Sequence, residues 1–474
     1  MIDRAEILAA STDLGLEPRV VEKDYVLGWL LAGIYAHEAL APAWVFKGGT
    51  CLKKCFFETY RFSEDLDFTL TEEAHLEERF LRGAFADVAA WVYDESGIEL
   101  PADQMRFKVY RNKRGGLSTE GSIYYSGPLP RAGSLPRIKL DLTVDELLVL
   151  APVERVVGHP YSDVPAGGIV ARSYAYEEIF AEKVRALGER TRPRDLYDVV
   201  NLFRHGEFRP AAAGVLDVLR KKCGFKKIEV PTFASLVSAT PELTADWAQM
   251  LGHQLPVLPP FEAFWNALPE FFGWLEGRVA PRGVAREPLQ TGNVVIRPAI
   301  GFLRRQGVPG SAFLEGVRFA ASNHLCVDLG YDGSVRRIEP YSLQRTLKGD
   351  ILLRAVSLPT GEPRSYRLDR IQSARVTEQS FVPRFAIELT PDDSVGALPG
   401  RHLSLAPRRG LMVGGSPPVR RTSGPTAGLT YVYQCGACGK KFPHKNPNPR
   451  IGPHKAPGGW ACSGRSGSLT DTRA

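Results

Sequence analysis

Long apolar segments and signal-peptide features are absent from this sequence of 474 residues. No hydrophobic run approaches the length of a membrane span, and the N-terminus, MIDRAEILAA, lacks the apolar core of a secretory signal. We therefore expect a cytoplasmic protein that does not contact a membrane. Hydrophobic residues make up 44% and charged residues 24% of the chain, which is typical of a soluble globular protein with room for two or three domains.

Cysteine is scarce, and acidic residues are missing from one long segment. Four of the seven cysteines, at positions 51, 55, 223 and 326, lie in apolar surroundings, which indicates reduced core thiols and not a disulfide framework. Residues 401–470 contain eleven Lys and Arg but no Asp or Glu, so the rest of the chain contributes −4 to the formal net charge of +7. Binding of nucleic acid is therefore to be sought in this C-terminal part.

The stretch from Trp44 to Leu70 combines two expected strands with a glycine turn. Residues 44–46 form a short apolar run that predicts a buried strand, and Gly48, Gly49 and Thr50 follow before a helical pattern. Two glycines between a strand and a helix let the backbone approach a ligand and direct helix N–H groups at phosphate.

The second expected strand carries two carboxylates. Residues two apart in a strand share a face, so Asp65 and Asp67 point together to one side. Two carboxylates this close repel each other unless a cation lies between them, and hard oxygen ligands suit Mg²⁺. An Asp-x-Asp pattern alone usually marks a solvated strand, but here it follows the glycine pair and the residues Arg61 and Ser63. This order favours transfer of a nucleotidyl or phosphoryl group.

A third carboxylate lies on a later expected strand, 137–144. Apolar residues alternate there with Lys139, Asp141 and Thr143. Asp141 is therefore either a third carboxylate of the site beside Asp65 and Asp67 or an ordinary surface residue of the strand.

Four short strings resemble motifs of one family. KGGT at 47–50, followed by R-x-S-x-D-L-D-F at 61–68, resembles the first motif of the AbiEii/AbiGii nucleotidyltransferase toxin family, a branch of the polymerase-β-type nucleotidyltransferases. AEK at 181–183 and R-x-R-D-L-Y-D at 192–198 resemble two later motifs. The resemblance implies an Mg²⁺-dependent enzyme that transfers nucleotides from an NTP to an acceptor. It further implies the toxin of a bacterial toxin–antitoxin or phage-defence pair, with a co-encoded antitoxin as partner.

The same resemblance implies a role for each matching residue. Asp65 and Asp67 would hold the Mg²⁺ that bridges the triphosphate, and Asp141 would help to bind a second metal ion and activate the acceptor hydroxyl. Lys183 would neutralise phosphate charge, whereas Asp195 is either catalytic or orients Lys183 or an arginine. The predicted catalytic residues are thus Asp65, Asp67, Asp141 and Lys183. The predicted nucleotide-binding residues are Lys47, Gly48, Gly49, Thr50, Arg61, Ser63, Lys183, Arg194 and Asp195.

From residue 311 to 390 the chain is rich in expected strands. Asp-Gly and Thr-Gly turns between these short strands predict a small barrel. Residues 337–340 and 364–371 resemble a WYL domain, a small Sm-like barrel associated with ligand or nucleic-acid sensing, although Ile-Leu-Leu at 351–353 replaces the namesake tripeptide. Its arginines either bind a phosphate-bearing ligand or form ordinary pairs with Glu339 and Asp369; these are Arg337, Arg364, Arg367 and Arg370.

Four residues near the C-terminus have zinc-ligand spacing. Cys435 and Cys438 lie on one tight Cys-x₂-Cys turn, and His454 with Cys462 can complete a tetrahedron. His444 is the alternative to His454, which we prefer because it lies nearer to Cys462 across a Pro-Gly-Gly turn. Zinc is preferred to a redox Cys-x₂-Cys because no thioredoxin-like βαβ pattern surrounds the motif.

Basic and aromatic residues surround these zinc-ligand candidates. This combination predicts docking of RNA, such as tRNA, or of another single strand. The residues are Lys440, Lys441, Phe442, Lys445, Arg450, Lys455, Trp460 and Arg465.

We therefore expect an α+β protein of four parts. These are a polymerase-β-like nucleotidyltransferase domain with a helical completion at 1–290, a WYL-like β-barrel at 291–390, a flexible linker at 391–430 and a zinc-knuckle-like finger at 431–467. One rival function is a non-catalytic nucleic-acid-binding regulator, against which the intact carboxylates argue. Another is a nucleotidyltransferase that acts on a protein or a small molecule. The sequence fixes neither the NTP nor the acceptor.

Overall fold

The computed structural model describes residues 1–391 and 430–473, except for 113, 131–132, 206–208, 281–283, 290–291, 436, 445–449, 452–453, 457–460 and 463–465. The chain divides into two compact units, Met1–Arg401 and His402–Ala474. The linker expected at 391–430 lies almost wholly outside the described residues, as do Lys445, Trp460 and Arg465.

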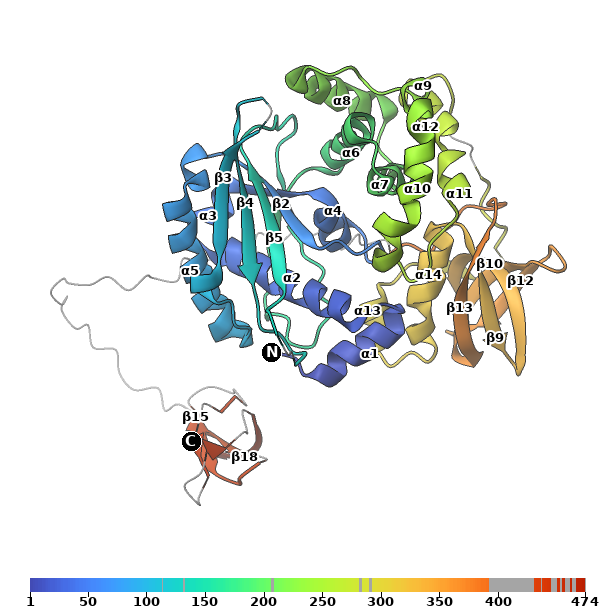
Figure 1. Ribbon diagram of the computed structural model, residues 1–474. Helices are drawn as coiled ribbons and strands as arrows, with labels where there is room; N and C mark the ends of the chain where they lie inside the picture. Colours follow the sequence, from blue (N-terminus) through green and yellow to red (C-terminus); the bar gives the residue numbers. More distant parts are fainter. Residues whose placement is uncertain are drawn as a thin grey trace, which may run out of the picture. The chain divides into compact units, whose positions relative to one another are not determined.

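A seven-stranded mixed sheet forms the centre of the first unit (Figure 1). Its strands are β1 (Trp44–Lys47), β2 (Asp65–Leu70), β3 (Arg106–Arg111), β4 (Leu117–Tyr124), β5 (Arg137–Thr143), β6 (Val153–Val156) and β7 (Val170–Ser173). They run in the order β3-β4-β5-β2-β1-β7-β6. Pairs β2–β5 and β1–β7 are parallel, while the other neighbours are antiparallel. The unbroken apolar run of β1 fits its place near the middle of the sheet, where every residue of the strand is buried.

Helices of the N-terminal part pack beside this sheet. They are α1 (Arg4–Leu14), α2 (Pro18–Ala36), α3 (Leu40–Ala43) and α5 (Glu78–Ser96). Helix α5 buries Leu81, Phe85, Val88 and Val92, which recur at helical spacing, and Gly97 ends it with φ of 78°. Between β1 and β2 the short helix α4 (Gly48–Cys51) continues into a π-helical turn, Leu52–Phe56.

A helical part follows the first sheet in the chain, as the sequence predicts. It comprises α6 (Tyr176–Arg190), α7 (Pro193–Arg204), α8 (Ala212–Lys226), α9 (Phe233–Leu236), α10 (Thr240–Leu251), α11 (Phe261–Trp265) and α12 (Leu268–Leu275). Proline in the first turn starts α7, where its missing N–H costs no hydrogen bond. Phe264, Phe271 and Trp274 are buried between these helices and belong to the core. None of the helices in the described part of the chain has the length and hydropathy needed to cross a membrane.

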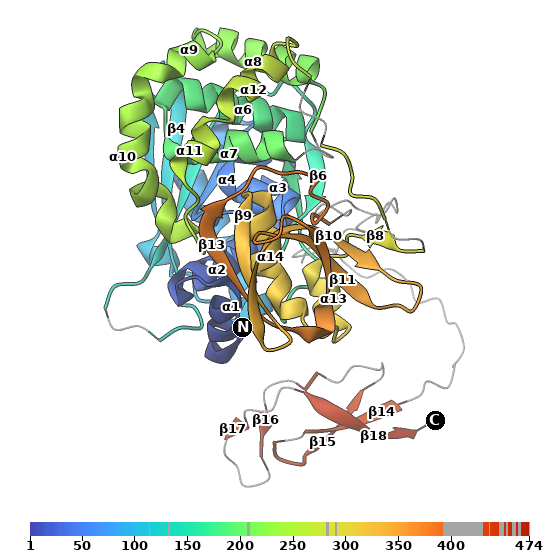
Figure 2. The same ribbon diagram turned by 90° about the vertical axis from the view of Figure 1, so that its right-hand side faces the viewer.

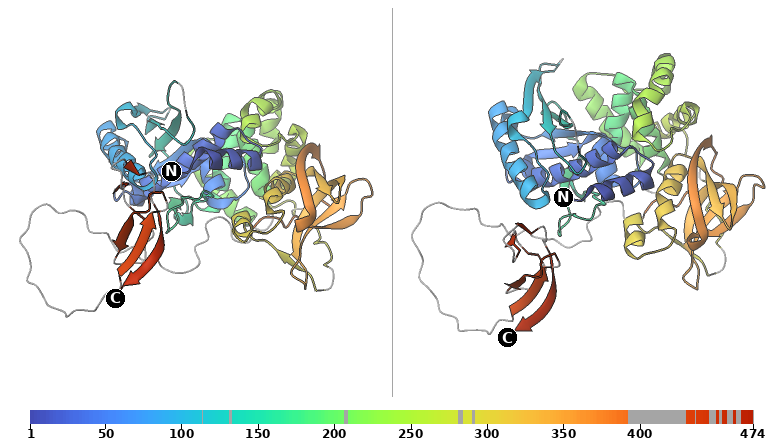
Figure 3. Two further views of the ribbon diagram at one scale, coloured as in Figure 1. Left: turned by 90° about the horizontal axis from the view of Figure 1, so that it is seen from below. Right: turned by 60° about the horizontal axis from the view of Figure 1, so that its bottom comes forward.

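A second sheet follows in the same unit. Its strands are β8 (Val294–Ile296), β9 (Leu325–Tyr331), β10 (Ser334–Arg345), β11 (Ile351–Ser357), β12 (Pro363–Arg367) and β13 (Ile371–Ser380), accompanied by α13 (Ile300–Arg305) and α14 (Leu314–Ser322). The order is β12-β11-β10-β9-β13, with β8 also paired to β10. Among the described residues β12 and β13 remain edges, so the closed Sm-like barrel that we expect is not confirmed. In Figure 1 this sheet lies on the opposite side of the unit from the edge strand β3, in Figure 2 it faces the viewer, and Figure 3 shows it in orange from two further directions.

Two details of this segment bear on the sequence predictions: the secondary structure of residues 314–322 and the partners of the arginines. Leu314–Ser322, expected among the strands, is a helix, because Leu314, Val317 and Ala321 recur at helical spacing and are buried. The four arginines expected either to bind a phosphate-bearing ligand or to form ordinary ion pairs do form ion pairs. Arg337 pairs with Asp328 and not with Glu339. The contacts are Arg337–Asp328 at 2.7 Å, Arg364–Glu362 at 2.7 Å, Arg367–Asp369 at 2.9 Å and Arg370–Asp332 at 4.0 Å.

The second unit is small. Its strands are β14 (Thr430–Cys435), β15 (Lys441–His444), β16 (His454–Lys455), β17 (Ala461–Cys462) and β18 (Gly467–Arg473). A three-stranded sheet has the order β15-β14-β18, and β16 pairs with β17. One buried cluster comprises Cys435, Ile451, Ala456 and Cys462, with Cys438 and Phe442 packed against them, and β14 also buries Val432 and Tyr433.

Candidate active site and metal centre

Three carboxylates meet on the β2–β5 strand pair. The parallel register aligns Asp67 with Asp141 and Asp65 with Lys139. Asp65 and Asp67 are half-buried, while Leu66 between them is fully buried, as the alternation of the strand predicts. The fold therefore brings the third carboxylate beside the first two although about 75 residues separate them in sequence.

These carboxylates repel one another. Burial and the neighbouring Asp141 raise the pKa of Asp67 to about 6, although Lys47 and Lys183 oppose the shift. Burial, and to a smaller extent Asp141, also raises the pKa of Asp65. A cation held among the three groups would relieve this repulsion.

The two glycines after β1 allow a close approach to this site. Gly48 has φ of +80°, and a Cβ there would lie 2.1 Å from Oδ2 of Asp67. A Cβ at Gly49 would lie 2.6 Å from Nη2 of Arg61. Both positions therefore require glycine, one for its backbone conformation and both for the space that neighbouring side chains occupy.

Thr50 and Ser63 lie around the same turn. The Thr50 hydroxyl donates a hydrogen bond to the backbone carbonyl of Asp65, which ties the turn to β2. Ser63 is half-buried, and its Oγ would lie 3.1 Å from a Cβ placed on Gly49. The Thr50 hydroxyl is thus engaged in holding the site together.

Asp198 joins two of the predicted cationic residues. Arg61, which is 2% exposed, donates hydrogen bonds of 2.7 Å from Nε and Nη2 to the two Asp198 oxygens. Lys183 Nζ lies 2.7 Å from Asp198 Oδ2 and 3.6 Å from Asp195 Oδ1. Although burial opposes it, Arg61 and Lys183 hold the pKa of Asp198 well below its usual range. Asp195 also accepts hydrogen bonds of 2.7 and 2.9 Å from Arg190, which favours its orienting role over a catalytic one.

Arg194 differs from these paired cations. Among the described residues no hydrogen bond or ion pair holds its guanidinium, which is half-buried and within electrostatic reach of Asp65. Burial lowers the pKa of Arg194. Its charge is therefore available to a bound anion.

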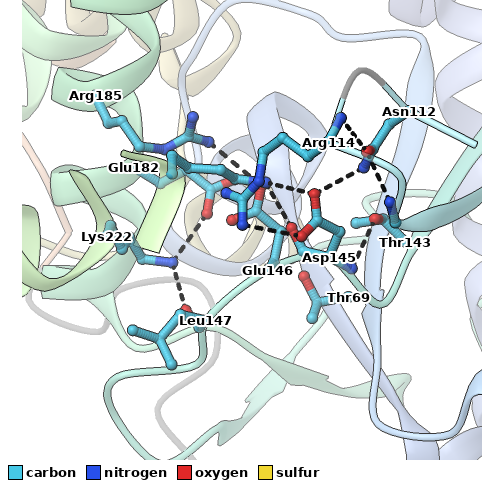
Figure 4. Close-up of polar contacts among 12 residues, drawn as sticks. Thr69, Asn112, Arg114, Thr143, Asp145, Glu146, Leu147, Glu182, Arg185 and Lys222 are labelled. Atoms are coloured by element: carbon cyan, nitrogen blue, oxygen red, sulfur yellow. Dashed lines mark hydrogen bonds and ion pairs between the residues drawn. The ribbon is translucent and has the colours of Figure 1, made fainter. Parts of the chain in front are cut away.

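Lys47 belongs to a buried ion network behind the glycine turn. Its Nζ lies 3.4 Å from Glu182 and 3.9 Å from Glu146. Figure 4 shows how the network continues: Arg185 contacts Glu146 at 3.4 Å and Lys222 donates to Glu182 at 3.2 Å. These contacts join β1, the segment after β5, and helices α6 and α8, so they fix the sheet against the helical part.

Six members of these networks are not among the predicted site residues: Asp198, Arg190, Glu146, Glu182, Arg185 and Lys222. Asp198 follows Asp195 by three residues on α7 and so shares its face, but this spacing does not identify its partners Arg61 and Lys183. Glu146 and Lys222 come from segments that are distant in the chain, and no periodic pattern connects them.

The second unit gathers the four predicted zinc ligands. The ligand atoms of Cys435, Cys438, His454 and Cys462 all lie within 4.8 Å of one another. Cys435 Sγ is 3.8 Å from Cys462 Sγ, and Cys438 Sγ is 3.2 Å from His454 Nε2. Zinc–sulfur bonds of about 2.3 Å in a tetrahedron place two sulfurs about 3.8 Å apart, so the cluster has the dimensions of a zinc site.

The local backbone accounts for this cluster. The N–H of Gly439 donates to the carbonyl of Cys435 at 2.8 Å, which closes a tight turn, and Gly439 has φ of +72°. The β16–β17 pair aligns His454 with Cys462. His454 thus belongs to the described cluster, while the side chain of the alternative, His444, is outside the described part of the chain.

Comparison with known proteins agrees with the sequence motifs. Residues 29–270 match the family described as nucleotidyl transferase AbiEii toxin, type IV toxin–antitoxin system. No curated protein matches the chain.

Several solved structures show partial similarity. MenT4, a nucleotidyltransferase toxin from Mycobacterium tuberculosis H37Rv, is 18% identical with a TM-score of 0.37, over 59% of this chain and 91% of that one. A putative nucleotidyltransferase from H. pylori is 19% identical with a TM-score of 0.36, over 56% of this chain and all of that one. JHP933 from Helicobacter pylori is 18% identical with a TM-score of 0.34, over 56% and 96% of the two chains.

The family match spans just over half of the chain and includes the glycine turn, the three carboxylates and the Lys183–Asp198 network. This chain is a nucleotidyltransferase that belongs to the AbiEii family of toxins from type IV toxin–antitoxin systems.

Proposed function

We propose that this chain transfers a nucleotidyl group from an NTP to RNA, such as tRNA, with Mg²⁺ held by Asp65, Asp67 and Asp141. It would act in the cytoplasm as the toxin whose partner is a co-encoded antitoxin, and protection against phage is a setting in which such a toxin is useful. The observation that carries the proposal is the parallel β2–β5 register, which puts Asp67 beside Asp141 directly against Gly48.

The residues present fit a divalent cation. All three donors are carboxylate oxygens, the ligands that Mg²⁺ prefers, and burial together with the neighbouring Asp141 raises the pKa of Asp67. When bound, Mg²⁺ would supply charge stabilisation to the transferring phosphoryl group. Asp141 pairs with Lys139 at 3.0 Å. If the acceptor displaced Lys139 from this ion pair, the Asp141 carboxylate would be free to accept the proton of the acceptor hydroxyl.

The chain's own cations would position the triphosphate. Lys183 is fixed by Asp195 and Asp198, so it would present charge without losing side-chain entropy at the moment of binding. Arg194 is unpaired among the described residues and lies near Asp65, where its guanidinium fork suits phosphate oxygens. Lys47 and Arg61 would act indirectly, since carboxylates hold both.

A zinc ion in the second unit would complete this proposal. The four-residue cluster of Cys435, Cys438, His454 and Cys462 fits a closed, structural site. The unit it holds lies in the segment that contains eleven Lys and Arg among residues 401–470 and no acid. This charge supports RNA as the acceptor, with the zinc unit as a docking module.

The test is label transfer. Purified full-length protein is incubated with Mg²⁺, one labelled NTP at a time, and total RNA or protein-containing lysate. Label should appear in RNA, and the Asp65→Asn/Asp67→Asn double variant should give none, while Asp94→Asn on the exposed face of α5 should label normally. Label in protein or in a small molecule instead would establish the rival acceptor class. Equal labelling by the wild type and the double variant would overturn the site.

A further inference from the structure

A cavity lies within the first unit, between the part that carries the candidate active site and the strand-rich segment from β8 to β13. Its volume is about 60 Å³, room for a group the size of about four to six water molecules, since one buried water needs about 10–15 Å³. Its walls come from residues 57–60, the C-terminal half of α7, the end of α14 and residues 387–391. The last two lie beyond residues 29–270, so the family domain alone does not build this cavity.

Arg204 brings an uncompensated charge to this cavity. Its Nη2 donates to the carbonyl of Ala263 at 2.6 Å and its guanidinium packs on Phe264 at 4.7 Å. Nη1 is buried and has no hydrogen-bond partner among the described residues. Burial lowers the pKa of Arg204 to about 10, and no carboxylate in the described chain opposes this. A desolvated cation without a counter-ion is costly and favours an anion as its partner.

The other charged groups in the cavity wall are already paired. Arg318 contacts Glu58 at 2.6 Å, and Glu388 contacts Arg297 at 2.9 Å. Burial lowers the pKa of both His205 and His324, so neither adds positive charge at neutral pH. Among the described residues of the cavity wall, Arg204 is thus the charged group that lacks a counter-ion, and an external anion would supply one.

The cavity also offers an unused acceptor. Oδ1 of Asn323 is buried without a hydrogen-bond partner in the described structure, while its Nδ2 donates to the carbonyl of Phe319 at 2.9 Å. A ligand that suits the site must therefore accept from a guanidinium and donate to an amide oxygen. Hydrogen phosphate does both, because it carries anionic oxygens and one O–H.

We propose that this cavity is a phosphate site, in which Arg204 Nη1 donates to an anionic oxygen and Asn323 Oδ1 accepts from the protonated one. The volume of about 60 Å³ fits the phosphate group itself. Inorganic phosphate should bind better than sulfate, which has no proton to donate at neutral pH.

The cavity shares a residue contact with the catalytic network. Tyr60 lines it and donates a 2.9 Å hydrogen bond to Asp198, which in turn holds Lys183. Tyr197 and Arg204 also line the cavity, and both lie on α7, the helix that carries Asp198. Occupancy is thereby linked to the position of Lys183, a consequence that rests on the proposed function.

Calorimetric titration of the full chain with inorganic phosphate, without NTP or metal, tests the site. Arg204→Gln should weaken phosphate binding roughly 10- to 100-fold, as expected for loss of a charged hydrogen bond. Arg209→Gln is the matched control: Arg209 also packs on an aromatic ring, Phe203 at 5.0 Å, and donates to a backbone carbonyl at 3.0 Å, but it is outside the cavity wall. Equal phosphate affinity of the wild type and Arg204→Gln would overturn the proposal, as would sulfate binding as tightly as phosphate.

Stability gives a second readout that keeps the test valid if binding is weak. Removal of a cation whose Nη1 is buried and unpaired in the described structure should raise the melting temperature of Arg204→Gln above that of the wild type in phosphate-free buffer. Added phosphate should then raise the melting temperature of the wild type and leave that of the variant unchanged. A variant that melts lower than the wild type in both buffers would show that Arg204 is a structural cation and would remove the basis of the site.

The link to catalysis is tested separately. Phosphate should change the KM for NTP about 5-fold or more in the wild type, and Tyr60→Phe should bind phosphate normally but lose this change. A KM that does not respond to phosphate in the wild type would refute the link. Absence of transfer with every NTP would count against the proposed function, while the calorimetric result would still stand on its own.

Discussion

The two units of this chain treat positive charge in opposite ways. In Met1–Arg401 most cations around the candidate active site are bound to buried carboxylates, as Arg61 and Lys183 are to Asp198, and Arg194 is the exception. Residues 401–470 contain no acid, and the described lysines 440 and 441 are exposed. The first unit uses its positive charge to hold its own geometry, whereas the second leaves it available to a polyanion.

The units also differ in what holds them together. The first buries one large core that extends from Ile2 to Leu389, while the second, among its described residues, buries only six apolar side chains, two of them cysteines. So small a core does not offset the entropy of ordering the chain. The zinc ion proposed at the Cys/His cluster would then supply folding free energy to the second unit and would be irrelevant to the first.

The largest expected effect separates chemistry from folding within the first unit. Replacement of Asp65 and Asp67 by Asn should lower nucleotidyl transfer by roughly 10³-fold or more, because the cation loses charged ligands. The fold should persist, and relief of repulsion should raise the melting temperature in the absence of Mg²⁺. Transfer rates and melting curves measure both. A double variant that melts well below the wild type would mean that these carboxylates serve the fold.

The next effect sharpens the difference between the cores. Protein purified without chelators should contain about one zinc ion per chain, and Cys435→Ser with Cys438→Ser should abolish it. The second unit should then unfold and become sensitive to protease, while the first keeps its melting temperature. Cys223→Ser, a buried cysteine in the first unit, is the control and should retain zinc. Metal analysis that finds no zinc in the wild type would contradict the prediction.

The sequence predicts the local parts of this arrangement better than the contacts between them. Alternation predicts the common face of Asp65 and Asp67, and the glycine pair predicts the close turn, because both depend on neighbouring residues. The zinc ligands follow from spacing in the same way. The closed barrel is not confirmed, and α14 is mistaken for strand because a short apolar stretch suits either period.

Long-range ion pairs escape this kind of reasoning. Asp198 accepts from Arg61 across 137 residues, and Lys222 reaches Glu182 across 40. A charged residue on a helix is usually solvated, so nothing in its own segment shows that it is buried and paired. Only the packing of the helical part against the sheet reveals these contacts.

A third prediction breaks the internal pairing of charge in the first unit. Asp198→Asn should destabilise the protein by about 3–5 kcal/mol, because Arg61 and Lys183 are left buried without their counter-ion. The exposed pair Asp217–Lys221 is the matched control, and Asp217→Asn should cost less than about 1 kcal/mol. Chemical denaturation measures both.

The same residue sets the acid sensitivity of the fold. The folded-state pKa of Asp198 is depressed, so its contribution is fully present above the unfolded value of about 3.9 and is lost as pH falls below it. If Asp198→Asn and Asp217→Asn prove equally harmless at pH 7, the pairing is not a source of stability.

A fourth prediction concerns the protonation of the metal site. Because the pKa of Asp67 is raised to about 6, Mg²⁺ must displace a proton at lower pH. Mg²⁺ affinity should rise roughly tenfold per pH unit up to about pH 6 and level off above it. Without Mg²⁺ the sign for folding is reversed. The folded state binds the proton more tightly than the unfolded chain, so this contribution to stability falls as pH rises from about 4 to 6. Titration with Mg²⁺ at several pH values measures the effect, and constant affinity between pH 5 and 7 is the contrary outcome.

The smallest expected effect tests whether the free charge of the second unit serves RNA. Lysines 440 and 441 are exposed beside the Cys438 turn, and each phosphate contact with single-stranded RNA contributes about 0.7 to the slope of log affinity against log salt. Changing both to Gln should therefore reduce the slope by about 1.4 and weaken binding most at low salt. The same change at Lys221 and Lys348, two exposed lysines of the first unit, should leave the slope unaltered. Deleting residues 402–474 should flatten the slope further without affecting NTP binding. Superimposable salt curves for the wild type, the Lys440/Lys441 variant and the truncation would show that the second unit does not hold the acceptor, and would favour a protein or small-molecule substrate.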